Sequence, residues 1–201
     1  ALGRVGKQAI ERYADYEQLV GGVETLFKDS APVVEKYANE AYKTAGLSAN
    51  EYMETVTSFS ASLIQSLGGD TKKASEYGNR AIIDMSDNAN KMGTSMEMIQ
   101  NAYQGFAKQN YTMLDNLKLG YGGTKTEMER LLKDAQKISG VKYDIKNLAD
   151  VYNAIHVIQN ELGVTGTTAE EAEKTISGSS NAMKAAFDNF LNGSGSPEEL
   201  G

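Results

Sequence analysis

The sequence predicts an all-α protein, a compact bundle of about seven or eight short amphipathic helices. Two observations carry this prediction. Apolar residues recur at steps of three and four along most of the 201 residues, which is the spacing of one helix face. In addition, a serine or threonine followed three residues later by glutamate stands four times just before such a stretch, as in a helix-capping box.

The first four expected helices follow from their start and stop signals. The first covers residues 8–27, with apolar positions from Ile10 and Tyr13 to Phe27, and the second covers 30–46, begun by Ser30 and Pro32 and ended by Gly46. The third covers 48–67 and begins with the box Ser48–Glu51. The fourth covers 70–93, begun by Asp70 and ended by Gly93. Gly21 and Gly22 interrupt the first helix and would let another helix come close.

The last four expected helices cover residues 94–106, begun by the box Thr94–Glu97; 124–140, begun by Thr124–Glu127; 148–162, ended by Gly163; and 167–191, begun by Thr167–Glu170. In the final helix Met183, Phe187 and Phe190 are expected to face inward. Residues 141–143 are compatible with a single edge strand or with a spacer.

Residues 100–132, called the elbow below, join two of these helices through an aromatic and glycine-rich segment. Gly120, Gly122 and Gly123 surround Tyr121, which indicates backbone at positive φ or packed closely against a neighbour. The elbow is too apolar for an ordinary solvent loop. We expect a packed core seam or an assembly surface formed by Tyr103, Phe106, Tyr111, Met113, Leu114, Leu117, Leu119 and Tyr121.

The segment GYGGTKT at 120–126 has some features of a phosphate-binding loop, because a glycine-rich turn leads into a helix N-terminus. Its spacing differs from that motif, since Thr124 separates Gly123 from Lys125 and no strand precedes it. We therefore interpret the segment as a structural turn with a helix cap.

Composition limits the function further. The net charge is −7, so the chain as a whole should not attract nucleic-acid phosphates, and we expect no sequence-specific nucleic-acid binding. No apolar run is long enough for a membrane-spanning helix, and no membrane insertion is expected. We expect one helical domain over residues 1–191 and a flexible tail or linker, rich in glycine and serine, over 192–201.

The residues indicate no catalytic, metal or cofactor site. There is no cysteine, and His156, the single histidine, is expected to be structural or at the surface. Clustered carboxylates such as Glu127 with Glu129 stand in first helical turns, where they stabilise the helix dipole. The 11 tyrosines and 8 methionines suit either a core without tryptophan or faces that bind partners.

Three segments carry a resemblance to a known family. They are IIDMSDNANKMGTSMEMIQNAYQGFAKQNYTMLDNLKLGYGGTKTEMERLLKDA at 82–135, YDIKNLADVYNAIHVIQNELGVTGTTAEEAEKTI at 143–176 and NAMKAAFDNFL at 181–191. Together they closely resemble the tape measure proteins of long-tailed bacteriophages and related prophages, and the resemblance covers about residues 58–191.

The resemblance implies a structural, non-enzymatic function. Copies of a long helical chain fill the tail lumen, tail protein polymerises around them with the help of assembly chaperones, and chain length sets tail length. On infection the chain leaves the tail ahead of the DNA. The implied partners are further copies of the chain in a small ring-like or trimeric oligomer, tail tube and tail-tip proteins, and tail assembly chaperones. The implied locations are the virion tail lumen and, during assembly, the host cytoplasm.

This sequence lacks the long rod-like region of a complete tape measure protein, so it would act as one compact helical region. Two alternatives remain open. One is a peptidoglycan-degrading region, which some complete tape measure proteins carry. The other is a generic helical effector or binding module.

Overall fold

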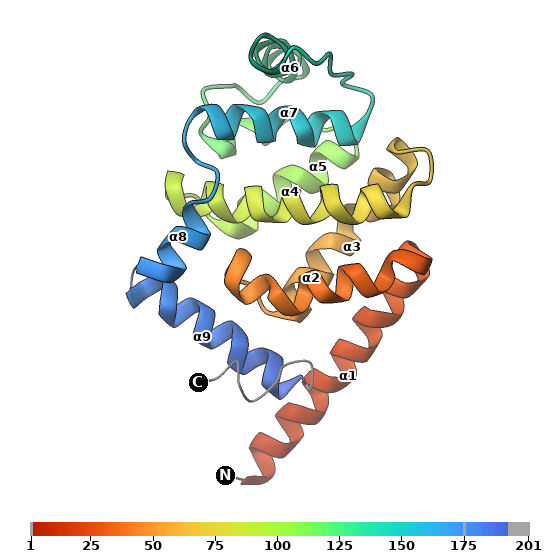
Figure 1. Ribbon diagram of the computed structural model, residues 1–201, viewed down its shortest axis with the longest axis vertical. Helices are drawn as coiled ribbons and strands as arrows, with labels where there is room; N and C mark the ends of the chain where they lie inside the picture. Colours follow the sequence, from red (N-terminus) through yellow and green to blue (C-terminus); the bar gives the residue numbers. More distant parts are fainter. Residues whose placement is uncertain (1, 175, 193–201) are drawn as a thin grey trace. The chain divides into compact units, whose positions relative to one another are not determined.

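The computed structural model describes residues 2–174 and 176–192, and this part of the chain confirms the all-α prediction (Figure 1). It contains helices and no strand, and residues 141–143 form an irregular connection. The helices are α1 (Leu2–Phe27), α2 (Ala31–Thr44), α3 (Ala49–Ser66), α4 (Thr71–Met92), α5 (Met96–Ala107), α6 (Lys125–Ser139), α7 (Leu148–Glu161), α8 (Thr167–Lys174) and α9 (Ile176–Leu191), with the short 3-10 helices η1 (Lys28–Ser30) and η2 (Leu114–Leu117).

The chain divides into two compact units, each of which is described by itself. Unit 1 consists of Ala1–Thr57 and Thr168–Gly201, and unit 2 consists of Ser58–Thr167. The single domain expected over residues 1–191 therefore stays a prediction. Of the expected tail, Asn192 is buried, and residues 193–201 lie outside the described part of the chain.

In unit 1, helix α2 packs against both α1 and α9. Val23 and Phe27 of α1 are fully buried, and Tyr42 of α2 packs against Ala185 and Ala186 of α9. These small side chains let α9 lie close to α2. As a result, α9 buries the face that carries Ala185 and Ala186, whereas its large apolar residues predict that another face is buried.

Two long-range polar contacts fix α9 in unit 1. The side-chain oxygen of Asn189 accepts a hydrogen bond of 2.6 Å from the amide of Ala49, the first residue of α3. This bond satisfies one of the amides that a helix N-terminus leaves without an intrahelical partner. Arg12 of α1 donates to Asp188 of α9 at 2.9 Å.

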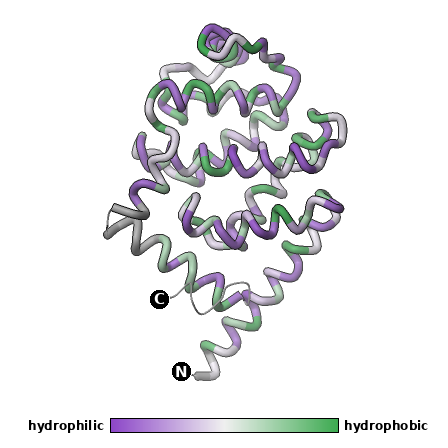
Figure 2. Tube along the Cα trace, in the orientation of Figure 1, coloured by the Kyte–Doolittle hydropathy of each residue, from purple (hydrophilic) through white to green (hydrophobic). Residues whose placement is uncertain are grey.

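Unit 2 is built around α7, which packs against α6 and α4 and is stacked between them in Figure 1. Aromatic rings fill the space beside it: Tyr152 lies edge-on to Phe59 at 5.4 Å and near Tyr103 at 5.0 Å between ring centroids. Hydrophobic and hydrophilic residues alternate along these helices at short intervals (Figure 2), as amphipathic helices require.

Helix starts were predicted with mixed success. The box at Ser48 is confirmed, since the Glu51 amide donates to the Ser48 hydroxyl at 3.2 Å and the Ser48 amide donates to Glu51 at 3.4 Å. Asp70 caps α4 by accepting from the Lys73 amide at 3.0 Å, also as predicted. The start at Thr94 was wrong: Ser95 caps α5, because the Thr94 hydroxyl donates to Asn88 instead.

The boxes at Thr124 and Thr167 also differ from the prediction. Thr124 caps α6 by accepting from the Glu127 amide at 3.1 Å, but the Glu127 carboxylate accepts from Gly122 rather than from Thr124. The Thr167 hydroxyl donates to backbone carbonyls of Val164 and Asp87. The expected helix 167–191 is described as α8 and α9, on either side of residue 175.

Three expectations about packing in unit 1 were wrong. Ile10 and Tyr13 are 72% and 47% exposed, and α1 begins at Leu2 rather than at residue 8. Met183, Phe187 and Phe190 point outward, because Ala185, Ala186 and Asn189 occupy the buried face of α9. A Cβ atom added at Gly21 or Gly22 would meet nothing within 4 Å, so no helix packs closely there.

Candidate functional site

The most distinctive site in unit 2 is a group of buried polar side chains on the second half of α4. Residues 84–88 are all buried, although four of the five are polar. Asp84, Asp87 and Asn88 stand at spacings of three and four, so they share one face of the helix. We call these three residues the α4 polar hub.

Asp84 binds His156 of α7. The Nδ1 atom of His156 lies 2.9 and 3.0 Å from the two carboxylate oxygens of Asp84. The Asp84 side chain is 2% exposed, whereas that of His156 is 25% exposed. Burial raises the pKa of Asp84 above its ordinary value, although the hydrogen bond and the charge of His156 oppose this effect.

Asp87 holds the connection between α7 and α8. Its carboxylate accepts a hydrogen bond of 2.8 Å from the Gly166 amide, and its backbone carbonyl accepts one of 3.3 Å from the Thr167 hydroxyl. Gly166 has φ +88°, a conformation that a residue with a side chain rarely adopts. The connection is therefore shaped so that a backbone amide reaches a buried carboxylate.

Asn88 joins three further parts of unit 2. Its side-chain amide donates to the Leu117 carbonyl at 2.9 Å and to the Gln159 side chain at 2.8 Å. Its side-chain oxygen accepts from the Thr94 hydroxyl at 2.8 Å. Gln159 in turn donates to the Asp84 carbonyl at 3.0 Å, so the hub ties α4 to α7, to the elbow and to the start of α5.

The aromatic cluster lies beside the hub. The Tyr152 hydroxyl donates to the Tyr103 carbonyl at 2.7 Å, while the Tyr103 hydroxyl is buried without a hydrogen-bond partner. Burial raises the pKa of Tyr103 well above its ordinary value, and the charges of Asp84 and Asp87 raise it further. The tyrosine that begins the predicted seam therefore lies near both hub carboxylates.

The structure places most of the predicted elbow seam in the core of unit 2. Six of its eight residues are buried: Tyr103, Phe106, Tyr111, Leu114, Leu117 and Leu119. Met113 is 39% exposed, and Tyr121 is partly buried. The Phe106 and Tyr111 rings stack at 6.3 Å, and the Leu117 carbonyl is bound to Asn88. The buried members therefore act by packing.

Tyr121 attaches the outer end of the elbow to α6. Its hydroxyl donates to Asp134 at 2.6 Å, and the Arg130 guanidinium lies over its ring at 4.3 Å. Arg130 also donates to the Gly120 carbonyl at 2.7 Å and to Glu127 at 2.7 Å. The hydrogen bonds from Arg130 and from the Gly122 amide lower the pKa of Glu127 to about 2.

The elbow glycines show both features expected of them, which are a positive φ and a backbone packed closely against a neighbour. Gly120 has φ +93°. A Cβ atom at Gly123 would lie 2.2 Å from the Thr112 carbonyl oxygen, so the backbone approaches too closely for any side chain. At Gly122 the same atom would lie 3.4 Å from the flexible Glu127 side chain. Turn geometry therefore explains the glycine-rich segment without a phosphate.

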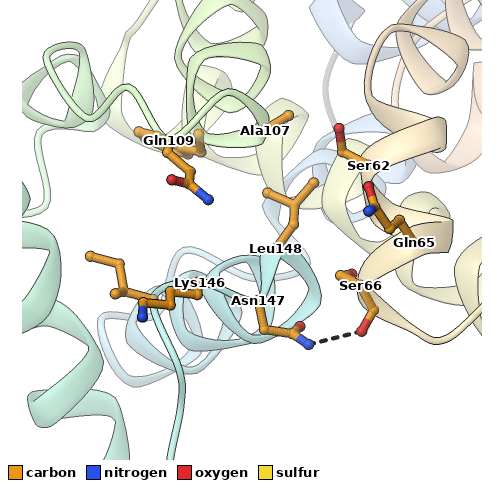
Figure 3. A pocket seen from close by; sticks show the side chains of 10 residues that line it. Ser62, Gln65, Ser66, Ala107, Gln109, Lys146, Asn147 and Leu148 are labelled. Atoms are coloured by element: carbon orange, nitrogen blue, oxygen red, sulfur yellow. Dashed lines mark hydrogen bonds between the residues drawn. The ribbon is translucent and has the colours of Figure 1, made fainter.

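A pocket of about 360 Å³ lies where α3, α5 and α7 meet in unit 2 (Figure 3). Its lining includes Gln65, Gln109 and Lys146, and Asn147 donates to the Ser66 carbonyl at 2.8 Å across one edge. The first amides of α7 already have partners, since Ala149 donates to Ser66 and Asp150 donates to Asn147. The helix N-terminus is therefore occupied by the protein itself.

The hub side chains use their hydrogen bonds to connect separate segments of unit 2. Within the described residues no group of three or more histidine, cysteine, aspartate or glutamate side chains is arranged to hold a metal ion. In the same part of the chain, no helix has the length and hydropathy needed to cross a membrane. Each hub side chain instead fixes one or more segments that are distant in sequence.

Sequence reasoning missed the hub. Helical periodicity identified the expected helix 70–93 from its apolar residues, and Asp84, Asp87 and Asn88, which lie on the helix surface beside those residues, were not identified as buried. The missed signal was the polar run Asp84–Asn88. Other parts of the chain cover this helix on several sides, and each polar group that is buried there needs a hydrogen-bond partner. No protein-family model, no curated protein and no solved structure matches the chain.

Proposed function

We propose that this chain is a structural, non-enzymatic region of a phage tail tape measure protein. It would take part in tail assembly and length determination inside the tail tube, and in contacts with the tail tip or in DNA ejection. Its partners would be further copies of itself in a small ring-like or trimeric oligomer, tail tube and tail-tip proteins, and assembly chaperones. It would act in the virion tail lumen and, before that, in the host cytoplasm.

One observation carries the proposal most directly. Residues 82–135, which bear the strongest resemblance to tape measure proteins, supply much of the interior of unit 2, including the hub, the buried elbow and the inner face of α6. Many of the residues that carry the resemblance are therefore buried residues that hold unit 2 together. Such a pattern is expected of a folded structural region that acts through its surface.

The hub supports a structural function as well. Asp84 and His156 resemble a catalytic pair in chemistry, but the carboxylate is buried and its neighbours are the partners that connect helices. Asp87 and Asn88 are each committed to backbone groups of other segments. The polar groups are therefore used for internal hydrogen bonding.

Tail length is the decisive test. Deleting about 100 codons from the complete reading frame, outside the region that encodes unit 2, should shorten tails by about 150 Å if the removed part is helical, at about 1.5 Å per residue. Electron microscopy of the resulting particles measures this directly. Tails of unchanged length would contradict the proposal.

The enzyme alternative has its own test. The purified chain is incubated with cell-wall peptidoglycan, and soluble fragments are measured by mass spectrometry against a known muramidase. We expect no release above buffer. Release that disappears in a His156→Ala variant would favour a peptidoglycan-degrading region instead.

A further inference from the structure

The imidazole ring of His156 uses one nitrogen inside the protein and leaves the other to solvent. Its Nδ1 atom lies 2.9 and 3.0 Å from the two carboxylate oxygens of Asp84, whereas its Nε2 atom bonds to no described residue. The Asp84 side chain is 2% exposed, that of His156 is 25% exposed, and the Nε2 atom is not enclosed by the protein. The pair therefore presents Nε2 at the surface of unit 2.

The buried carboxylate also sets the tautomer of His156. An ionised carboxylate accepts a hydrogen bond from Nδ1–H, so the proton stays on Nδ1 and Nε2 keeps its lone pair. A carboxylate in this position stabilises the imidazolium that forms when Nε2 binds an electrophile. His156 and Asp84 thus supply an accessible lone pair and a group that orients the ring, which together make an activated nucleophile.

Other uses of a solvent-facing histidine nitrogen need a second component. A metal ion needs further ligands, and among the residues that the structure describes no suitable group of three or more histidine, cysteine, aspartate or glutamate side chains occurs. General-base catalysis needs a nucleophile within hydrogen-bond reach, and no described hydroxyl group bonds to Nε2. Covalent capture by Nε2 itself needs neither of these components.

A cation lies beside the pair. Arg80 precedes Asp84 by one turn of α4, and its guanidinium lies over the Tyr77 ring at 5.2 Å. It donates a hydrogen bond to the side-chain oxygen of Asn153, which precedes His156 by one turn of α7. Arg80 is therefore fixed at the contact between α4 and α7, two helices that lie side by side (Figure 1).

The charge of Arg80 acts at the same place. Burial raises the pKa of Asp84, and the positive charge of Arg80 is one of the effects that oppose this rise, as is the contact with His156. A guanidinium has several N–H donors in the planar arrangement that binds phosphate oxygens, and Asn153 occupies one of them. The site thus combines a nucleophilic nitrogen with a nearby group that suits a phosphoryl anion.

We propose that His156 is a phosphorylation site, at which Nε2 accepts a phosphoryl group from a donor of the phosphoramidate class and Arg80 binds the phosphoryl oxygens. The Nε2 lone pair attacks phosphorus, and the bond from phosphorus to the protonated donor nitrogen breaks, so that a neutral amine leaves with the bonding electrons. The proton on Nδ1 stays in place. The product is a phosphorylated imidazolium whose positive charge faces Asp84.

Phosphorylation changes the charge of unit 2 at one defined point. The phosphoryl group brings about two negative charges to the edge of α7. Arg80 of α4 then binds a group that is attached to α7, which adds a charged link between the two helices. This inference goes beyond the proposed function, because it gives a structural region a surface whose charge depends on a phosphoryl donor.

The test uses the full 201-residue chain and potassium phosphoramidate as the probe. His156 is the single histidine, so phosphohistidine formed in the reaction reports on this residue alone. Phosphorus NMR distinguishes phosphate on Nε2 from phosphate on Nδ1. We expect the folded chain to carry phosphate on Nε2 only. The chain unfolded in urea should show both products at early times, because Nδ1 is then released from Asp84.

Variants test the two neighbours of His156. Arg80→Met should slow phosphorylation roughly fivefold, which is the effect expected of one partly exposed charge, and Arg80→Lys should recover part of the rate. Asp84→Asn should slow it roughly tenfold, since the imidazolium loses its counter-charge. Lys72→Met is the matched control: it removes an exposed lysine of α4 about 12 Å farther along the helix axis and should react as wild type.

The outcomes separate a built site from an ordinary histidine. Phosphate on Nδ1 of the folded chain, or a folded chain that stays unmodified while the unfolded chain reacts, would overturn the inference. Equal rates for wild type and Arg80→Met would overturn it as well. Circular dichroism checks that each variant folds. If Asp84→Asn unfolds, the position of the phosphate in wild type and the rates of the two Arg80 variants decide the question without it.

Discussion

His156 Nδ1 lies 2.9 Å from the carboxylate of Asp84, and this pair connects the surface of α7 to the buried interior of unit 2. Removing the histidine leaves a carboxylate that is 2% exposed without its partner. We expect His156→Ala to lower the free energy of unfolding by about 2 to 4 kcal/mol. Urea denaturation followed by circular dichroism measures this, and a loss below about 0.5 kcal/mol, the usual range for a surface substitution, would contradict it.

The raised pKa of Asp84 predicts a pH dependence of definite sign. A carboxyl whose pKa is higher in the folded than in the unfolded chain contributes stability below its unfolded pKa, and this contribution is lost as pH rises through the folded pKa. Wild type should therefore gain stability relative to Asp84→Asn as pH falls from about 7 to about 4. Denaturant midpoints of both proteins across this range measure the difference. A constant difference, or one of opposite sign, would show that the buried carboxyl is not the titrating group.

We expect a single substitution of Asn88 to lower the stability of unit 2 strongly. Its side-chain amide donates to Leu117 and Gln159, and its side-chain oxygen accepts from Thr94. Asn88→Ala leaves a buried carbonyl and a buried side-chain amide without their partner, and we expect a loss of about 2 to 4 kcal/mol. Thr94→Val removes one bond at the edge of the hub and should cost about 1 kcal/mol. Equal effects of the two substitutions would argue against the hub as the joining element.

The Glu127–Arg130 contact can be measured at a single residue. Glu127 should titrate at about 2 in a side-chain NMR experiment, and Arg130→Met should raise its pKa toward the ordinary value. Because the pKa is lowered in the folded chain, the contribution of Glu127 is present above its unfolded pKa and is lost as pH falls toward 2. Lys125→Met removes an exposed lysine of the same helix and is the control. A Glu127 that titrates normally in wild type would exclude the contact in solution.

Helical periodicity predicted the fold class because it is a local property. Ser48, Asp70 and Thr124 use nearby amides, so their caps could be read from the sequence. Thr94 and Thr167 differ because their hydroxyls donate elsewhere: Thr94 to Asn88 in the preceding helix, and Thr167 to the carbonyls of Val164 and Asp87. The two helix caps were predicted wrongly because the capping pattern does not show which acceptor a threonine hydroxyl uses.

The hub and the buried face of α9 could not be predicted for a related reason. Asp84 and Asp87 look like solvent-facing residues until α7 and the connection to α8 cover them. On α9, Asn189 is buried because it caps α3, and Phe187 is exposed as a consequence of that contact. The elbow seam was easier to predict, since a loop that carries many large apolar side chains needs to bury them.

Two neighbouring glycines of the elbow give a matched pair of substitutions. A Cβ atom at Gly123 would collide with the Thr112 carbonyl oxygen, which belongs to the backbone and cannot move without shifting the elbow. We expect Gly123→Ala to cost about 3 kcal/mol, as overpacking of a rigid site does. Gly122→Ala meets only the Glu127 side chain, at ordinary contact distances from its Cγ atom and one carboxylate oxygen, and should cost less than about 1 kcal/mol. Thermal unfolding of both variants separates these cases, and equal stability would contradict the close approach at Gly123.

Leu117 and Met113 distinguish packing from assembly within the elbow. Leu117 is fully buried, and Met113 is 39% exposed. Leu117→Asp places a charge in the core without a partner, so we expect unit 2 to unfold at room temperature, with a loss of more than about 4 kcal/mol. Met113→Asp should change stability by less than about 1 kcal/mol, because its charge reaches water. If Leu117→Asp instead stays folded by circular dichroism and loses only self-association, the elbow is an assembly surface. A folded Leu117→Asp variant with unchanged association would contradict both interpretations, because its side chain could then be neither in the core nor in a contact.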